Sequence, residues 1–200
     1  MRTVTVPAAR LRRWLAGFAE RHGPTQADAS AELVTLTGSD GAHASIEVPF
    51  PPLVGELAGH VERSRRVGVL LVRRGGHAAG IFAGTELIAS KVGSSYVQGN
   101  TRAGGWSQQR YARRRANQAS AAFADAADVA ARILLPRLDD LEALVCGGDR
   151  LAVDAVLADV RLEPLRPLVT GGLLPVPDPR LKVLQAAPEQ FTAARIRLDP

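Results

Sequence analysis

Residues 91–118 have the sequence KVGSSYVQGNTRAGGWSQQRYARRRANQ, in which a loop rich in Gly, Ser and Asn leads into a strongly basic helix. Residues 93–105 include four Gly, two Ser and one Asn, with no apolar period that would hold the segment on a core. This composition predicts an exposed, mobile loop over about residues 93–107. The rest of the chain is expected to be the scaffold that carries it.

The segment after this loop is predicted to form a helix over about residues 108–134, with Ser107 in the N-cap position. Apolar residues recur along it at alternating spacings of four and three, which predicts a single buried stripe. The members of this stripe are Ala112, Ala116, Ala119, Phe123, Ala126, Ala130 and Ile133.

The remaining arc of the first turns of this helix is basic. No Asp or Glu occurs between Glu86 and Asp125 to neutralise that charge. The pattern predicts a local anion-binding surface, best suited to phosphate. Its arginines are Arg110, Arg113, Arg114 and Arg115.

Length and composition limit the possible classes of protein. A chain of 200 residues with 46% hydrophobic content predicts one domain over residues 1–200. The net charge is +5, and nearly all of the positive charge is arginine, which favours bidentate phosphate contacts. A single cysteine excludes an internal disulfide, and no apolar run approaches the roughly 18 residues of a membrane span. We therefore expect a cytoplasmic protein without membrane contact.

The N-terminal region predicts a helix that opens at Pro7 and ends at Gly23-Pro24. Its polar side carries a second group of arginines. Such a basic face could contact nucleic acid, but an ordinary solvated helix face is the preferred interpretation. The residues are Arg10, Arg12, Arg13 and Arg21.

The remaining pattern predicts mostly antiparallel strands first and alternating helix and strand afterwards. Residues 67–73 (VGVLLVR) are nearly all apolar, as expected of a central strand covered on both faces. The fold class predicted is α/β, a mixed sheet with helices on its faces. Further strands are expected at residues 31–37, 42–48, 78–83, 86–90, 142–146, 182–185 and 194–198, a strand or turn at 165–174, and helices near 53–62 and 150–159.

Familiar catalytic sets are missing from the sequence. The four histidines are scattered without paired spacing, which gives no support to a zinc site, and there is no Walker loop, GxSxG elbow or CxxC pair. Cys146, at the end of a predicted strand, is interpreted as a small buried residue rather than a nucleophile. Gly104-Gly105 with Gln108 and Gln109 is more unusual. A neutral amide can hold a water and polarise a carbonyl, which suits hydrolysis of an activated ester.

The segment GGWSQQRYARRRANQ, behind its loop and strand, resembles the catalytic region of the Vms-like release factors, in particular their bacterial, actinobacterial-type peptidyl-tRNA hydrolase branch. These are relatives of the middle domain of eukaryotic and archaeal class I release factors, whose loop carries a GGQ tripeptide. The resemblance in motif covers residues 93–118. It implies a ribonuclease H-like α/β domain without that fold's metal-binding carboxylates, and it implies no cofactor.

The resemblance also implies roles for individual residues. Gly104 and Gly105 match the glycine pair of the family. Gln108 matches its catalytic glutamine if Trp106 is one inserted residue, and Gln109 is the alternative. The RNA-binding residues implied are Arg102, Trp106, Arg110, Arg113, Arg114 and Arg115.

The activity implied is hydrolysis of the ester between nascent peptide and tRNA on the ribosomal large subunit, in ribosome quality control or rescue. Its partners would be the large subunit, rRNA and peptidyl-tRNA. Two alternatives stay open. One is a non-catalytic ribosome- or RNA-binding module. The other is a tRNA acceptor-end endonuclease, although the sequence lacks the carboxylate cluster that two-metal phosphodiester cleavage needs. The sequence does not give an oligomeric state.

Overall fold

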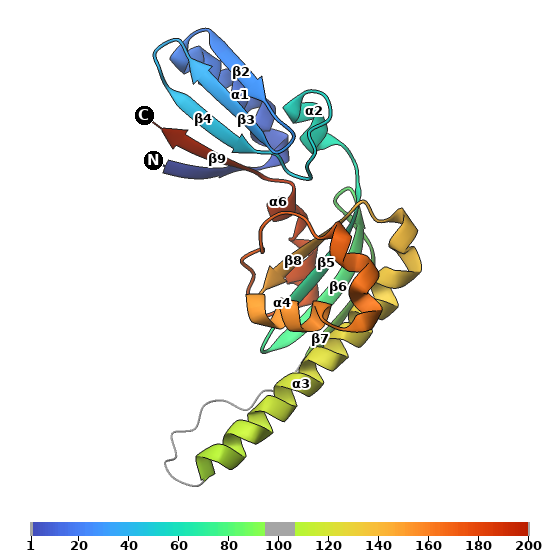
Figure 1. Cartoon of the computed structure of the whole chain (residues 1–200). Helices are drawn as coiled ribbons and strands as arrows, with labels where there is room; N and C mark the ends of the chain where they lie inside the picture. The colour runs from blue at the N-terminus through green and yellow to red at the C-terminus, as the bar shows by residue number, and fades with distance from the viewer. Residues whose placement is uncertain (1, 95–106, 200) are drawn as a thin grey trace. The chain divides into compact units, whose positions relative to one another are not determined.

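The computed structural model describes residues 2–94 and 107–199, and for residues 107–117 it describes the backbone alone. The chain divides into two compact units (Figure 1). Unit 1 comprises Met1–Ser64 and Pro188–Pro200, and unit 2 comprises Arg65–Ala187. That residues 1–200 fold as one domain stays a prediction.

Unit 1 contains a five-stranded antiparallel sheet in the order β1-β9-β4-β3-β2. The predicted strands at residues 31–37 and 42–48 are confirmed as the antiparallel pair β3 and β4, and residues 194–198 are confirmed within β9. The elements are β1 (Arg2–Val6), α1 (Ala8–His22), β2 (Thr25–Ala29), β3 (Leu33–Gly38), β4 (His43–Glu47), α2 (Leu57–Glu62), α6 (Pro188–Phe191) and β9 (Ala194–Asp199).

The core of unit 1 follows from alternation along its strands. Val34 and Leu36 of β3 and Ala44 and Ile46 of β4 are buried, whereas the residues between them are more exposed. Helix α1 covers this face and contributes fully buried apolar side chains, since its apolar positions recur at helical spacing. The two from α1 are Leu11 and Phe18.

Unit 2 contains a four-stranded sheet in the order β7-β6-β5-β8. Strand β5 pairs antiparallel with β6 and parallel with β8, so the apolar run at residues 67–73 is confirmed as a central strand. The elements are β5 (Arg66–Arg73), β6 (Gly76–Ala83), β7 (Glu86–Ser94), α3 (Ser107–Leu134), η1 (Leu135–Asp140), β8 (Ala143–Gly148), α4 (Arg150–Leu157), η2 (Val160–Leu168) and α5 (Leu181–Gln185).

Helices cover both faces of this mixed sheet, which confirms the predicted fold class. Ala126 and Ala130 of α3 and Val153 of α4 join one buried cluster with residues of β5, β6 and β8. Gly80 points to the opposite face, because side chains alternate along a strand, and a Cβ there would lie 2.9 Å from Leu184 of α5. Arg161 of η2 fixes the outer side of α3 through an ion pair to Asp128 at 2.7 Å.

Near the C-terminus of unit 2, one prediction was wrong and a second was wrong over part of its range. Residues 182–185 lie in helix α5, not in a strand, because a short run such as LKVLQ fits both periods. Residues 165–168 are the end of the 3-10 helix η2, and residues 169–174 are irregular, with isolated bridges at Val169 and Leu174. Strands β1 and β2 were not predicted. Within residues 2–94 and 107–199, no helix has the length and apolar character needed to cross a membrane.

Candidate functional site

The candidate catalytic loop is held by β7 and α3. Strand β7 ends at Ser94 and α3 begins at Ser107, one residue before the predicted start of the helix. Residues 95–106 between them lie outside the described part of the chain. The candidate residues Arg102, Gly104, Gly105 and Trp106 therefore stay predictions.

Helix α3 is longer than the sheet on which it packs. Its 28 residues span about 42 Å, whereas the nine residues of β7, the longest strand of that sheet, span about 31 Å. Among the α3 side chains that the structure describes, those that join the buried cluster of unit 2 extend from Phe123 to Leu134. The backbone of α3 before this packed segment continues past the sheet toward the loop (Figure 1).

The predicted glutamines and arginines fall on this N-terminal extension of α3. Gln108 and Gln109 are in its first turn. Arg110 precedes Arg113 and Arg114 by three and four residues, so these three positions are neighbours on one side of the helix. Arg115 follows directly. The structure describes only the backbone here, and it brings these positions together on one helical segment next to the loop.

The predicted buried stripe of α3 is confirmed where its side chains are described. Ala126 and Ala130 have no exposed surface, and Phe123 and Ile133 pack against the same cluster. Ala119 is partly buried. The two remaining members, Ala112 and Ala116, lie where only the backbone is described.

A buried histidine lies beneath α3 at the base of the loop. His77 of β6 is 1% exposed, and its Nε2 atom has no hydrogen-bond partner among the residues that the structure describes. The paired residue on β7 is Gly93, where a Cβ would collide with the His77 ring. Burial lowers the pKa of His77, and the charge of Asp125 on α3 opposes this only in part. The imidazole is therefore neutral at pH 7 and acts as a packing group that fixes the end of β7.

The other histidines serve local structure in unit 1. His22 Nδ1 lies 2.8 Å from Asp40, and His43 Nδ1 lies 3.1 Å from the Thr37 hydroxyl. His60 Nδ1 accepts a hydrogen bond from the Val54 N–H at 3.0 Å, so its Nε2 carries the proton and donates to the Pro49 carbonyl at 2.9 Å. Within the described residues, no three His, Cys, Asp or Glu side chains gather as a metal site requires.

Cys146 is confirmed as a buried residue. Its side chain lies in the core of unit 2 with 6% exposure, and burial raises the pKa of its thiol to about 12. A thiol in this state is not a nucleophile near neutral pH. The described part of the chain thus leaves the amide-bearing loop and its basic helix as the strongest candidate site.

A known protein family matches most of this chain. A family model described as the actinobacteria/chloroflexi VLRF1 release factor matches residues 65–197. The chain belongs to this VLRF1 release factor family. The match includes the loop, the whole of α3 and all of unit 2, whereas residues 1–64 of unit 1 lie outside it.

Two solved structures show weaker similarity to this VLRF1 release factor. The archaeal translation termination factor aRF1 is 20% identical, with a TM-score of 0.48, over 76% of this chain and 45% of that one. A structure titled only as an archaeal protein is 17% identical, with a TM-score of 0.44, over 92% of this chain and 62% of that one. The chain thus spans less than two thirds of either. No curated protein matches it significantly.

Sequence reasoning missed the buried His77 and its contact with Gly93. In the sequence, His77 is a single histidine within an apolar strand, and this is not a specific signal of any role. The pairing of His77 with Gly93 depends on the register between β6 and β7, which includes an irregularity between Ile81 and Phe82. Only the short turn between two predicted strands indicated that these residues approach each other.

Proposed function

We propose that this VLRF1 release factor hydrolyses the ester that joins a nascent peptide to tRNA on the ribosomal large subunit. The observation that carries the proposal is the family match across a segment free of acidic residues, in which Gly104-Gly105, Gln108 and Gln109 precede a basic helix. The proposal places the protein in the cytoplasm, in ribosome quality control or rescue.

The basic start of α3 would anchor the protein on phosphates of rRNA or tRNA. Arg113 to Arg115 contribute three adjacent charges, and no acid precedes Asp125 on this helix. Because the backbone of α3 continues past the sheet at this end (Figure 1), the extension would enter an RNA cavity ahead of the core of unit 2. The glycine pair Gly104-Gly105 would allow close approach of the backbone to RNA.

The chemistry would rest on positioning rather than on proton transfer by a side chain. Gln108, with Gln109 as the alternative, would orient a water at the ester carbonyl carbon. N–H groups of the amide and backbone would stabilise the developing oxyanion, and RNA hydroxyls would carry the proton. The proposed mechanism uses no titrating protein group and no metal; neutral His77 and protonated Cys146 are both buried away from a proton-transfer role.

The test is peptide release from large subunits loaded with labelled peptidyl-tRNA, comparing the unaltered protein with Gln108→Ala and Gln109→Ala. The expected result is release with an intact tRNA 3′ end, abolished by one substitution while subunit binding persists. A shortened tRNA would instead indicate an endonuclease. Binding without release by the unaltered protein would indicate a non-catalytic module and would contradict the proposal.

A further inference from the structure

The arginines of α1 divide into two groups with different surroundings. Arg12 donates to both carboxylate oxygens of Glu62 on α2, at 2.9 and 3.1 Å, and lies 3.4 Å from Glu56. These contacts raise the pKa of Arg12 and occupy its charge. Arg10, Arg13 and Arg21 have no carboxylate partner in the described part of the chain.

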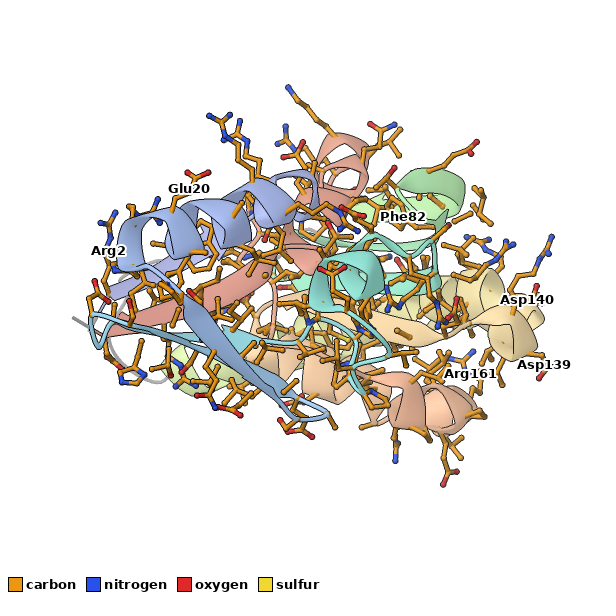
Figure 2. All side chains as sticks on the ribbon, turned by 90° about the horizontal axis from the view of Figure 1, so that it is seen from above. Arg2, Glu20, Phe82, Asp139, Asp140 and Arg161 are labelled. Carbon is orange, nitrogen blue, oxygen red and sulfur yellow. The ribbon has the colours of Figure 1, made fainter. Side chains whose placement is uncertain are left out.

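These three arginines line one groove in unit 1, between β1 and α1. It has a volume of about 620 Å³, within the range of sites that hold small ligands. Its described lining contains no acidic residue, and Glu20, the one acid of α1, is not part of it; Figure 2 shows Glu20 pointing out from the helix. The lining residues are Thr5, Val6, Pro7, Arg10, Arg13, Trp14 and Arg21.

The arrangement along α1 brings the charges to one side. Positions 10, 13, 14, 17 and 21 follow the three- and four-residue spacing of one helical face. Gly17, in the middle of this row, has no side chain, and a Cβ there would lie 3.2 Å from the Arg21 Nη1 atom. The Arg21 guanidinium therefore lies over Gly17, while the residue remains exposed to solvent.

Trp14 supplies an aromatic surface among these charges. Its ring stacks on the buried Phe18, with centroids 5.7 Å apart and an interplanar angle of 26°. This contact fixes the indole against the core, while the residue remains partly exposed and lines the groove. A fixed ring flanked by unpaired arginines fits a ligand that combines phosphates with a flat aromatic group.

We propose that this groove is a second RNA-binding site, in which Arg10, Arg13 and Arg21 contact phosphates and Trp14 stacks on a base. The site lies outside the region matched by the VLRF1 family model. It extends the proposed function, from which it takes the ribosome as its setting, but it does not depend on ester hydrolysis. An acidic protein segment would use the arginines but leave the stacking surface without a purpose, so RNA fits the whole groove better.

The test uses Trp14 as a reporter in the full-length chain. The chain has two tryptophans, so Trp106→Phe leaves Trp14 as the sole source of tryptophan emission. A 12-nucleotide single-stranded RNA is titrated into this protein at several salt concentrations, and filter binding of the same RNA is measured in parallel. The expected result is saturable quenching of Trp14 emission that follows binding.

Matched variants in the same background separate the groove from general electrostatics. Replacing Arg10, Arg13 and Arg21 together by Ala should weaken the quenching affinity at least tenfold at low salt. It should also flatten the slope of log K against log salt by about 2, as three lost single-strand phosphate contacts imply. Arg12→Ala, which removes the same charge from the same helix outside the groove, should change the affinity less than twofold. Thermal unfolding of each variant checks that α1 remains folded.

Several results would overturn the inference. RNA binding that leaves Trp14 emission unchanged would place the RNA elsewhere. A loss of RNA affinity in Arg12→Ala as large as that from each groove arginine would show that binding depends on overall charge rather than on the groove. Quenching by polyglutamate with equal affinity would indicate an acidic protein partner, and absence of any RNA binding would exclude the site. Peptide release by the triple groove variant with Trp106 retained, at saturating concentration, separates the two proposals. Because release depends on Gln108 or Gln109 and not on the groove, its rate should match that of the unaltered protein even when RNA binding in the groove is lost.

Discussion

The C-terminal half of α3, Phe123–Leu134, packs on the unit 2 sheet, whereas residues 107–117 extend past it. The packed half contains Ala126 and Ala130 at zero exposure, and its outer side carries Asp125 and Asp128. The extended part has four arginines and no acid. One continuous helix thus combines a closely packed segment with a strongly basic one. Substitutions in the packed segment should change the unfolding free energy, and substitutions in the basic segment should change binding to the large subunit.

The largest effect on binding is expected from the extended part. Replacing Arg113, Arg114 and Arg115 together by Ala should weaken large-subunit binding by more than tenfold and flatten its salt dependence by about 2, because phosphate contacts release counterions. The unfolding free energy should change by less than about 0.5 kcal/mol, since the backbone of this segment extends past the sheet (Figure 1). Subunit co-sedimentation at several salt concentrations measures the first quantity and urea denaturation the second.

The control for this prediction is Arg132→Ala, which removes an exposed arginine from the packed half of the same helix. Its salt dependence should match that of the unaltered protein. An equal loss per arginine at both ends of α3 would contradict the division of the helix.

The packed half should respond in the opposite way. Ala130→Leu inserts extra carbon atoms where Ala130 has no exposed surface, and overpacking of this kind costs about 1–3 kcal/mol of unfolding free energy. Release activity below the unfolding transition should be retained, because the loop residues are unchanged. The measurement is urea denaturation paired with release at 20 °C. Full stability in the variant would show that α3 does not pack as described.

The base of the loop offers a third comparison. Gly93→Ala places a Cβ against the His77 ring on the neighbouring strand, so it should cost about 1–2 kcal/mol of unfolding free energy. Combining it with His77→Ala, which vacates the ring, should recover part of that loss compared with the sum of the single variants. Additive losses in the double-mutant cycle would mean that the two residues do not meet.

The smallest effect is a pH dependence from His77. Burial lowers the pKa of His77 in the folded state. Below a pH of about 6.5, His77 therefore binds a proton in the unfolded chain but stays neutral in the folded chain. The unfolding free energy should therefore decrease as the pH falls from 7.5 to 5.5. The unfolding free energy of the His77→Phe variant should decrease less over the same range. Parallel urea titrations across this range check the difference. Identical pH profiles would show that His77 titrates normally in the folded state.

The sequence predicted local features of this molecule better than distant pairings. Residues 67–73 and the helix beginning near Ser107 were recognisable because their apolar periods are long and consistent. Strand β1 was not, because its five residues acquire a partner only from β9, nearly the whole chain away. Neither periodicity nor composition predicts that Arg12 is paired with a carboxylate and Arg13 is not, because the partner of Arg12 is Glu62, fifty residues later.

The same difference applies to the two sites: the loop and basic helix were predicted from local sequence, and the groove of unit 1 was not. The residue types of the loop and basic helix and their order were evident from residues 91–118, a segment that lies within the region matched by the family model. The groove of unit 1 was weighed in sequence only as a basic helix face. Its recognition required the fold of β1 against α1 and the stacking of Trp14 on Phe18.

Single-turnover peptide release by a Gln108→Ala, Gln109→Ala double variant, at protein concentrations that saturate the large subunit, tests the central claim most directly. We predict a rate at least about 100-fold lower than that of the unaltered protein, as loss of an oxyanion-stabilising or water-positioning amide implies. The unfolding free energy should stay within about 0.5 kcal/mol. Release at an undiminished rate by the folded, bound double variant would contradict the assignment of the chemistry to this end of α3.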